Sequence, residues 1–589
     1  MSTISKLLSG METKFKVFSV LSPVSMIGEV VMETVIPFLM AQIIDEGIAN
    51  RDISYVVRVG LLMVALSVVS LAFGALGGIF SAHGATGFSR NLRRNVFSKI
   101  QTFSFGNIDH FSTSSLVTRL TTDITNLQNT YQMIIRLCFR APFMMVSGSV
   151  MACLINLRLA TVFFIAVPFL AVVLVLIGTR AYPRFSRMMK QYDQLNNTVQ
   201  ENLNAIRVVK SFVRGDHENK KFSDSAALVK KAQVSAEKLV IMALPMMMLV
   251  VYTCIIVALW FGGKMIVVGD MQTGQLISFI TYIGQILMSL MMLSMIFIML
   301  VLSRASMTRV VEVLDEVPEI KNPGPHAFVD QDSNVVHGIF DKVPNGSIDF
   351  RDVSFSYHKD PGNCVLTNVN LHIESGQMVG IIGGTGSSKT TLVSLIPRLY
   401  DVLSGSVSVG GIDVRKYDIK ALRDGVAMVL QKNVLFSGSI KSNLKWGDEN
   451  ASDEEIIAAC KASDAYEFVS SFPDGFDTDL GQGGVNLSGG QKQRLCIARA
   501  LLKKPKILIL DDSTSAVDTA TDARIRAALR SNLPDTTKIV IAQRINSVQD
   551  ADIIFVMDNG KIDGIGTHSE LLATNSIYRE VYESQQSKN

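Results

Sequence analysis

The sequence predicts a membrane domain of six α-helices followed by a soluble α/β domain. Three observations carry this prediction. Hydrophobic residues make up 48% of the 589 residues, which is high for a soluble chain of this length. Long uncharged runs are confined to residues 1–303. From residue 347 to residue 589, short apolar runs alternate with helical stretches, a pattern typical of parallel strands in a covered sheet. Residues 304–346, punctuated by proline and glycine, form the expected linker.

The six predicted spans are long apolar segments, and a helix needs about 20 such residues to cross a bilayer. The segment 141–157 is short, so its helix is expected to begin near Tyr131. That start places Arg136 and Arg140 toward the cytoplasmic end of the helix. The segments are Val17–Asn50, Val59–Ala82, Ala141–Leu157, Leu159–Thr179, Leu239–Gly263 and Met271–Ser303.

Basic residues predict the orientation of these spans. Seven lie in residues 83–140 and twelve in residues 180–238, whereas the other three connections together hold four. Because positively charged loops stay inside, the two long connections and both termini are expected in the cytoplasm. Both connections show helical periodicity, which predicts spanning helices that extend beyond the membrane. Polar interruptions at Gly106–Ser115 and Arg214–Ser223 are candidate contacts with the second domain.

Charge and cysteine usage exclude several classes of protein. A net charge of +4 gives no reason to expect a nucleic-acid partner. The six cysteines show no CxxC spacing, which argues against a zinc site or a disulfide framework and fits a reducing compartment. The first apolar run is too long for a signal peptide. Short outer loops favour a bacterial inner membrane.

A phosphate-binding loop follows the strand-like segment Met378–Ile382. Backbone N–H groups and the following helix dipole would hold phosphates there. Lys389 would reach the β- and γ-phosphates, and the Thr390 hydroxyl would bind Mg²⁺. Ser388 stands where the pattern has glycine. The loop comprises Gly383, Gly384, Thr385, Gly386, Ser387, Ser388, Lys389, Thr390 and Thr391.

Two carboxylates follow the apolar segment Ile507–Leu510. Asp511 suits the coordination shell of Mg²⁺, and Asp512 occupies the place of a base that orients water. ATP and Mg²⁺ are therefore the expected cofactors.

Between these two motifs lies a segment that resembles the signature of the ATP-binding cassette (ABC) transporter family. It comprises Leu487, Ser488, Gly489, Gly490 and Gln491. The resemblance implies that adenine stacks on Tyr357 and that Gln431 senses Mg²⁺. It implies a loop between paired domains at Ser515, Ala516, Val517 and Asp518. Gln543 occupies the switch position, where the family usually has histidine.

The resemblance covers nearly the whole chain, since six helices ahead of one cassette are the layout of half an ABC exporter. In this family two cassettes pair head to tail, and each ATP lies between the phosphate loop of one and the signature of the other. The resemblance therefore implies a second half-transporter subunit as partner, in a lipid bilayer, with the signature completing the partner's site.

Three departures from the family weaken the site that this chain's own phosphate loop builds. Asp512 replaces the usual glutamate, which withdraws the carboxylate by about 1.5 Å, and misplacement on that scale costs roughly 10²-fold in rate. Gln543 cannot carry a proton or a positive charge. Ser388 replaces glycine. This combination resembles the degenerate-site subunit of heterodimeric multidrug exporters; the alternative is a homodimer in which Asp512 is a slower base.

Glu29 and Glu33 lie one turn apart on one face of the first span. Ionisable groups at membrane depth usually face a cavity or a partner, so one interpretation is attraction of cationic, amphipathic cargo. The alternative places both near the outer end, solvated or hydrogen-bonded. Gln285 and Tyr282 are further cavity candidates. Later helices are rich in methionine, which suits either a promiscuous cavity or ordinary packing.

The sequence therefore predicts ATP-driven export of amphipathic or hydrophobic compounds, with multidrug efflux as the leading function. Export of a lipid or a peptide is the alternative within transport. A different class is an ATP-gated regulator without net transport.

Overall fold

The computed structural model describes residues 3–323, 327–329, 335–337, 339–513 and 517–586. The chain separates into two compact units. The first comprises residues 1–101 and 113–316, and the second comprises residues 102–112 and 317–589. Residues 102–112 therefore belong with the second unit although they lie within the first in sequence.

The first unit is entirely helical, and six of its helical spans are long and apolar enough to cross a membrane. This confirms the predicted six-helix domain. Two segments, Ile43–Ile48 and Arg119–Asp123, are π-helical. The α-helices are α1 (Thr3–Leu7), α2 (Thr13–Gln42), α3 (Ile53–Ile100), α5 (Thr113–Thr118), α6 (Ile124–Ile155), α7 (Leu157–Asn204), α8 (Ile206–Ser211), α9 (Gly215–Ile241), α10 (Ala243–Val268) and α11 (Thr273–Asp315).

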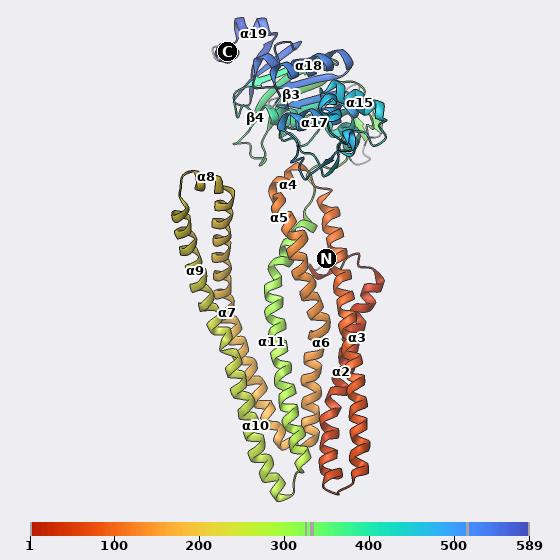
Figure 1. Cartoon of the computed structure of the whole chain (residues 1–589), viewed down its shortest axis with the longest axis vertical. Coiled ribbons are helices and arrows are strands. Elements are labelled where there is room, and N and C mark those ends of the chain that lie inside the picture. The colour runs from red at the N-terminus through yellow and green to blue at the C-terminus, as the bar shows by residue number, and fades with distance from the viewer. Residues whose placement is uncertain (1–2, 324–326, 330–334, 338, 514–516, 587–589) are drawn as a thin grey trace. The chain divides into compact units, whose positions relative to one another are not determined.

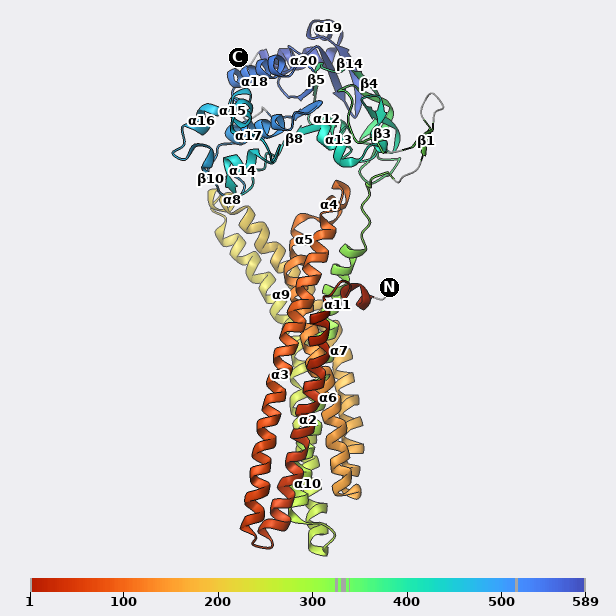
Figure 2. The ribbon, with the colours of Figure 1, turned by 90° about the vertical axis from the view of Figure 1, so that its right-hand side faces the viewer.

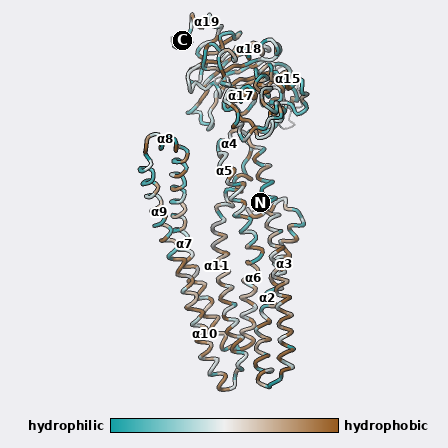
Figure 3. Tube along the Cα trace, viewed as in Figure 1, coloured by the Kyte–Doolittle hydropathy of each residue, from teal (hydrophilic) through white to brown (hydrophobic). Residues whose placement is uncertain are grey.

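The spans continue well beyond membrane thickness, as the basic connections predict. Helices α3 and α7 each have 48 residues, more than twice what the hydrocarbon core requires. Helices α7 and α9 run side by side, and short α8 joins them (Figures 1 and 2). Figure 3 shows hydrophilic residues gathered on α8 and α9 and hydrophobic ones on α10. These long extensions are the polar parts of the unit.

The second polar interruption lies earlier than the sequence suggests. The turn falls between Asn204 and Gly215, and residues 215–223 are the first turns of α9. Asp216 and Glu218 lie in the first turn of that helix, where negative charge interacts favourably with the helix dipole. The predicted interruption at Arg214–Ser223 is therefore wrong. The helical connection is interrupted instead at α8 and the turns on either side of it.

Small residues let α2 and α3 approach closely, as is common between membrane helices. A Cβ added at Gly87 would come within 2.1 Å of the Phe15 ring, and one at Gly77 within 2.2 Å of the Met26 methyl carbon. At the end of α2 that leads into α3, the Asp45 carboxylate accepts hydrogen bonds from the backbone N–H groups of Gly274 at 2.6 Å and Gln275 at 3.0 Å. This carboxylate caps the first turn of α11.

The second unit is an α/β domain with two larger sheets (Figure 1). Its strands are β1 (Ala327–Val329), β2 (Val335–His337), β3 (Ile348–Phe355), β4 (Leu366–Ile373), β5 (Met378–Gly383), β6 (Ser404–Val409), β7 (Ile412–Asp413), β8 (Val426–Val429), β9 (Gly438–Ser439), β10 (Asp479–Leu480), β11 (Ile507–Asp511), β12 (Thr537–Ile541), β13 (Ile553–Asp558) and β14 (Lys561–Gly566). Its helices are α4 (Phe105–Phe111), α12 (Lys389–Ser394), α13 (Ile419–Gly425), α14 (Ile440–Leu444), α15 (Asp453–Ala462), α16 (Tyr466–Ser470), α17 (Gly489–Leu502), α18 (Thr519–Asn532), α19 (His568–Thr574) and α20 (Ser576–Gln586).

Parallel pairing organises the six-stranded sheet, whose order is β14-β13-β5-β12-β11-β8. Strands β5, β12, β11 and β8 are parallel neighbours. Every residue of β11 and β12 is buried, which explains their continuous apolar sequence. The three strands predicted from short apolar runs are β5, β8 and β11. The smaller antiparallel sheet has the order β4-β3-β6-β7.

The close contact of α2 with α3 predicts that alanine at Gly87 destabilises the first unit. The added Cβ would lie 2.1 Å from Cγ of Phe15, an atom that rotation of the ring about the Cβ–Cγ bond does not move. Overpacking of this kind costs about 1–3 kcal/mol. We expect a lower midpoint of thermal unfolding for detergent-purified Gly87→Ala.

Gly78→Ala is the matched control, because nothing lies within 4 Å of a Cβ added there. Alanine is the better helix former, so the control is expected to be neutral or stabilising. Equal midpoints for the two variants would contradict the proposed packing.

Candidate functional site

Four parallel strands deliver the predicted nucleotide-binding residues to one edge of the sheet. Strand β5 ends at Gly383, where the phosphate loop begins, and β11 ends at Asp511. Gln431 and Gln543 each follow the end of a strand, β8 and β12. Because these strands are parallel and in register, their carboxyl ends meet, as ligand sites in such sheets do.

Lys389 is the first residue of α12, and its side chain lies over the phosphate loop. Its Nζ donates hydrogen bonds to the carbonyl oxygens of Gly383 at 3.0 Å and Gly384 at 2.8 Å, and to Ser387 Oγ at 3.2 Å. Burial lowers the pKa of the Lys389 ammonium, whereas the nearby Asp512 and Asp511 carboxylates oppose that change. The ammonium is thus positioned where the loop would cradle phosphates.

Ser388 adopts a left-handed backbone conformation, with φ of 72° and ψ of 24°. An L-residue other than glycine pays about 1–2 kcal/mol there because its Cβ crowds the backbone. This cost explains why glycine is the expected residue. Ser388 therefore holds the phosphate loop in a strained form of its usual geometry.

The residues predicted to hold Mg²⁺ fit that role. Thr390 Oγ1 donates a hydrogen bond to Asp511 Oδ1 at 2.9 Å, so the hydroxyl and the carboxylate face one another. Asp511 Oδ2 is buried and has no hydrogen-bond partner within the described residues, which leaves one oxygen for a cation. Burial raises the pKa of the Asp511 carboxyl, and the Asp512 charge adds to that rise.

Asp512 joins the remaining predicted residues of the site. Its Oδ2 accepts hydrogen bonds from Gln543 Nε2 at 2.9 Å and Gln431 Nε2 at 3.4 Å. Asp512 has a φ of 47°, a left-handed conformation that aspartate tolerates better than most residues. Burial raises the pKa of its carboxyl, whereas the two glutamine amides and the Lys389 charge oppose the rise. The short side chain is thus held by two neutral amides.

A contact between Tyr357 and Thr391 joins the predicted adenine position to α12, the helix that follows the phosphate loop. The Tyr357 hydroxyl lies 2.9 Å from Thr391 Oγ1. The Tyr357 ring is 45% exposed and packs edge-on against Phe355 and Tyr400, with centroid separations of 4.9 and 5.2 Å. Tyr357 is therefore exposed enough for a base to reach it.

Tyr400 connects that aromatic group to α4, and the sequence analysis missed it. Its hydroxyl donates to Asp109 Oδ2 at 2.7 Å, and its ring packs against Phe105 at 6.1 Å. Burial and Asp109 raise the pKa of Tyr400. The sequence offered no motif at this position. The only signal was the polar interruption Gly106–Ser115, which overlaps α4.

The signature residues lie at the start of α17, whereas the phosphate loop leads into α12. Ser488 and Gln491 form a capping box: Ser488 Oγ accepts from the Gln491 N–H at 3.3 Å, and Gln491 Oε1 accepts from the Ser488 N–H at 2.9 Å. Leu487 is buried, whereas Ser488 and Gly489 are exposed. Among the described residues, no hydrogen bond joins this segment to the phosphate loop. An exposed helix N-terminus of this kind suits phosphate from another molecule.

The predicted loop between paired domains is described in part. Val517 is buried, and the Asp518 carboxylate caps α18 by accepting the Thr521 N–H at 2.9 Å. Ser515 and Ala516 lie outside the described residues.

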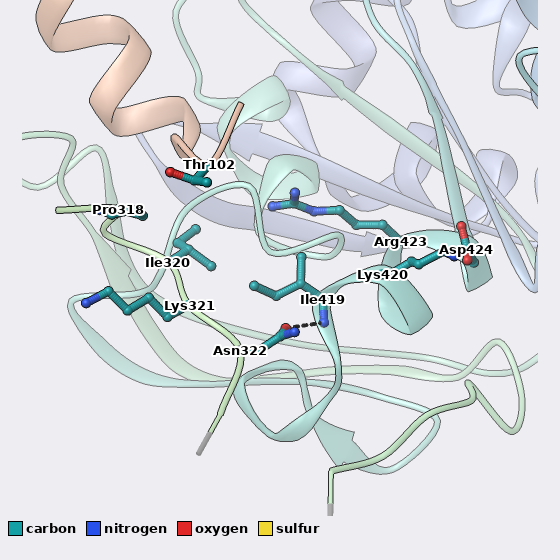
Figure 4. Close-up of a pocket in the computed structure, with 9 residues that line it drawn as sticks. All are labelled: Thr102, Pro318, Ile320, Lys321, Asn322, Ile419, Lys420, Arg423 and Asp424. Atoms are coloured by element: carbon teal, nitrogen blue, oxygen red, sulfur yellow. Dashed lines mark hydrogen bonds between the residues drawn. The ribbon is translucent and has the colours of Figure 1, made fainter. Parts of the chain in front are cut away.

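A cavity of about 580 Å³ lies where the linker enters the second unit (Figure 4). Asn322 Oδ1 accepts a hydrogen bond from the Ile419 N–H at 2.8 Å, which fixes the linker to the start of α13. None of the predicted nucleotide-binding residues lines this cavity. Its lining residues are Thr102, Pro318, Ile320, Lys321, Asn322, Ile419, Lys420, Arg423 and Asp424.

The cargo candidates lie in the first unit and have partners that the sequence did not indicate. Arg140, near the middle of α6, pairs with Glu33 at 3.0 Å and with Glu29 at 3.4 Å. Gln285 Nε2 lies 3.5 Å from the Glu33 carbonyl oxygen. Tyr282 is fully buried, and its hydroxyl donates to the Thr34 carbonyl at 2.7 Å. Tyr282 therefore ties α11 to α2.

Fold and site together define a class: a six-helix membrane domain fused to a P-loop ATPase. Comparisons with known proteins agree. Residues 20–306 match the family model described as the ABC transporter transmembrane region, and residues 366–515 match the one described as ABC transporter. The chain belongs to the ABC transporter family and is a half-transporter of the exporter type, an ATPase coupled to transport.

Several relatives cover nearly the full chain. An uncharacterized ABC transporter ATP-binding protein of Bacillus subtilis, YfiB, is 38% identical over 95% of both chains. An ATP-dependent lipid A-core flippase of Pseudomonas aeruginosa is 32% identical over 90% of this chain and 86% of the flippase. A bacterial Atm1-family ABC exporter with ATP bound superposes with a TM-score of 0.82 at 25% identity, over 97% of this chain and 98% of the other.

The left-handed conformation of Ser388 predicts that glycine at this position stabilises the second unit. Ser388→Gly removes a cost of about 1–2 kcal/mol, so we expect a higher midpoint of thermal unfolding for the full chain. Gly386 offers the reciprocal control, since its φ is +85° and no atom lies within 4 Å of a Cβ added there. Gly386→Ser is expected to lower the midpoint. The explanation fails if the two changes have the same sign.

The Tyr400 hydroxyl predicts a link between α4 and the nucleotide site. Tyr400→Phe keeps the ring contacts but removes the hydrogen bond to Asp109, which is worth about 0.5–1.5 kcal/mol. We expect cargo stimulation of the ATPase rate to fall roughly two- to tenfold while the KM for ATP stays within about twofold. Asp109→Asn retains an acceptor oxygen and should lose less. An unchanged degree of stimulation in Tyr400→Phe would contradict this role.

Proposed function

We propose that this chain is one subunit of a heterodimeric exporter that moves amphipathic or hydrophobic compounds out of a bacterial cell, with multidrug efflux as its function. Its own phosphate loop builds a weakened ATP site, and its signature completes the competent site of the partner. Both termini and the nucleotide-binding domain lie in the cytoplasm of this arrangement, as the basic connections 83–140 and 180–238 predict.

The observation that carries the proposal is the environment of Asp512. Hydrolysis needs a group that takes the proton of the attacking water as oxygen bonds to the γ-phosphorus and the bond to the β-phosphate oxygen breaks. The Asp512 carboxylate is shorter than the usual glutamate, and two glutamine amides already donate to it. Gln543 neither takes up a proton nor carries positive charge at the switch position. Together these features favour ATP binding over fast hydrolysis.

The signature side has none of these departures. Ser488 and Gln491 cap α17, and the segment from Leu487 to Gln491 keeps the family's sequence. A chain with a weakened phosphate site and an intact signature needs a partner that supplies the reverse combination. This asymmetry supports a heterodimer.

The coupling in this proposal uses the chain's own contacts. Mg²⁺ held by Thr390, Asp511 and Gln431 would neutralise phosphate charge. Closure of the paired cassettes around ATP would reposition Tyr357. Tyr400 would pass that movement to α4 through Asp109 and Phe105. Hydrolysis at the competent site then resets the pair.

Lipid export is the second candidate, and one observation favours it. A relative with 32% identity over 90% of this chain is a lipid A-core flippase. A homodimer with Asp512 as base and an ATP-gated regulator without net transport are the remaining alternatives. Cargo-stimulated ATPase activity and vesicle uptake separate a pump from a regulator.

The test replaces one residue in the chain's own ATP site and one residue in its signature. We expect Asp512→Asn to lower the ATPase rate of the purified complex with its partner half-transporter by less than about threefold. The partner's base catalyses most of the hydrolysis in that complex. Ser488→Arg should reduce the rate by at least about tenfold, since the signature completes the competent site. Steady-state phosphate release measures both.

A homodimer predicts a different result for Asp512→Asn. In that case Asp512→Asn removes the base from both sites, and the rate falls roughly 10²-fold or more, as expected for loss of a general base. Robust ATPase activity and a symmetric dimer from this chain alone would also overturn the heterodimer proposal.

A further inference from the structure

A group of charged and polar side chains lies inside the membrane domain, where α2, α6 and α11 meet. Arg140 of α6 donates to Glu33 Oε2 at 3.0 Å and lies 3.4 Å from Glu29 Oε1, both on α2. Gln285 of α11 approaches the Glu33 backbone at 3.5 Å. Arg136 lies one turn from Arg140 on the same helix. We name Glu29, Glu33, Arg136, Arg140 and Gln285 the charge cluster.

The charge cluster has unused hydrogen-bonding capacity of both kinds. Two buried acceptors, Glu29 Oε2 and Gln285 Oε1, have no hydrogen-bond partner within the part of the chain that the structure describes. The same holds for two buried donors, the Nε groups of Arg136 and Arg140. Leaving such atoms unsatisfied is costly, so a ligand that pairs with them would relieve that cost.

The charge cluster is closed on one side and open on another. A Cβ added at Gly74 of α3 would lie 2.8 Å from Glu29 Oε1, so α3 covers the cluster there. The side chains of Glu29 and Arg140 are 16% and 17% exposed, whereas that of Glu33 is 36% exposed. Charged groups are too costly to face lipid, so the open side at Glu33 suits a water-filled cavity or a protein partner, and it is the side from which a cargo would approach.

The signs of the charges decide what the cluster can select. Two carboxylates and two guanidinium groups leave it with no net formal charge. A purely cationic cargo would have to displace Arg140 from its carboxylates and leave the guanidinium unpaired. A purely anionic cargo would strand the carboxylates in the same way. A cargo that carries both charges exchanges partners with Arg140 and Glu33 together, so no charge is left alone.

We propose that the charge cluster is a cargo-binding site that selects amphiphiles with a zwitterionic head group. This inference rests on the proposed export function and replaces a purely cationic preference for Glu29 and Glu33. The cation of the head group pairs with Glu33 and Glu29, and its anion pairs with Arg140 and Arg136. Gln285 forms a hydrogen bond with a neutral polar atom of the head group that lies between its two charges.

The test compares head groups on one alkyl chain. The complete transporter in nanodiscs is titrated with tetradecylphosphocholine, tetradecyltrimethylammonium and tetradecyl phosphate, and the ATPase rate is followed. We expect the zwitterion to stimulate at least about fivefold more than either singly charged amphiphile at equal mole fraction. Equal stimulation by all three overturns the site while leaving the exporter proposal standing. Absence of stimulation by any amphiphile overturns both.

A second arm separates a lipid from a soluble cargo. Fluorescent phosphatidylcholine in proteoliposomes reports lipid movement between leaflets, and tetradecylphosphocholine uptake into inverted vesicles reports movement of a free amphiphile. ATP-dependent movement of either supports the site and names the source of the head group. Movement of neither, with a normal ATPase response to the zwitterion, overturns a cargo role.

Charge variants predict reciprocal changes of preference. Arg140→Gln leaves two carboxylates without their partner, so stimulation should shift toward tetradecyltrimethylammonium. Glu29→Gln with Glu33→Gln should shift it toward tetradecyl phosphate. Lys264→Gln is the control, because Lys264 lies over Trp260 on α10 and outside the cluster. It should keep the original order.

A purely structural ion pair predicts a different result. If Arg140 only ties α2 to α6, its loss lowers thermal stability and reduces the response to all three amphiphiles alike. Arg140→Gln also risks misfolding, so Glu33→Gln with Arg140→Gln provides a charge-balanced second variant. It should fold and lose the zwitterion preference by at least about threefold. An unchanged order of preference in that folded variant overturns the proposal.

Discussion

Parallel pairing of four buried strands is the constraint on which the ATPase half of this protein depends. Strands β8, β11, β12 and β5 pair side by side in one direction, so the residues that follow them converge at one edge. Gln431, Asp512 and Gln543 are far apart in sequence, yet hydrogen bonds link Asp512 to both glutamines. A register shift in any strand would separate a carboxylate from its neighbours and dismantle the site.

Much of this arrangement follows from the sequence. Long apolar runs identify the six spans, and the phosphate loop and the signature are contiguous motifs whose spacing carries their meaning. The turn at α8 was misplaced because polar residues continue into α9, where they suit a solvated helix start. Polarity alone does not distinguish a loop from the first turns of an exposed helix.

Contacts between distant residues were harder to predict. The sequence predicts Arg140 near the cytoplasmic end of its helix, and nothing in the sequence pairs it with Glu29 or Glu33, its partners in the structure. Tyr400 has no motif around it, and its role depends on α4, almost 300 residues earlier. Such partners are set by packing of helices and loops, which local patterns do not encode.

The assignment of residues 102–112 to the second unit has a consequence for dissecting the protein. Helix α4 is held there by Asp109 on Tyr400 and by Asn107, whose amide donates to the Val317 carbonyl at 3.1 Å. A cassette produced from Val317 onward would lack this helix and uncover the aromatic surface of Tyr400 beside Tyr357, the predicted adenine position. Proteolytic cleavage of the linker would likewise cut only one of three chain crossings between the units. The natural boundary of the nucleotide-binding body is therefore discontinuous in sequence.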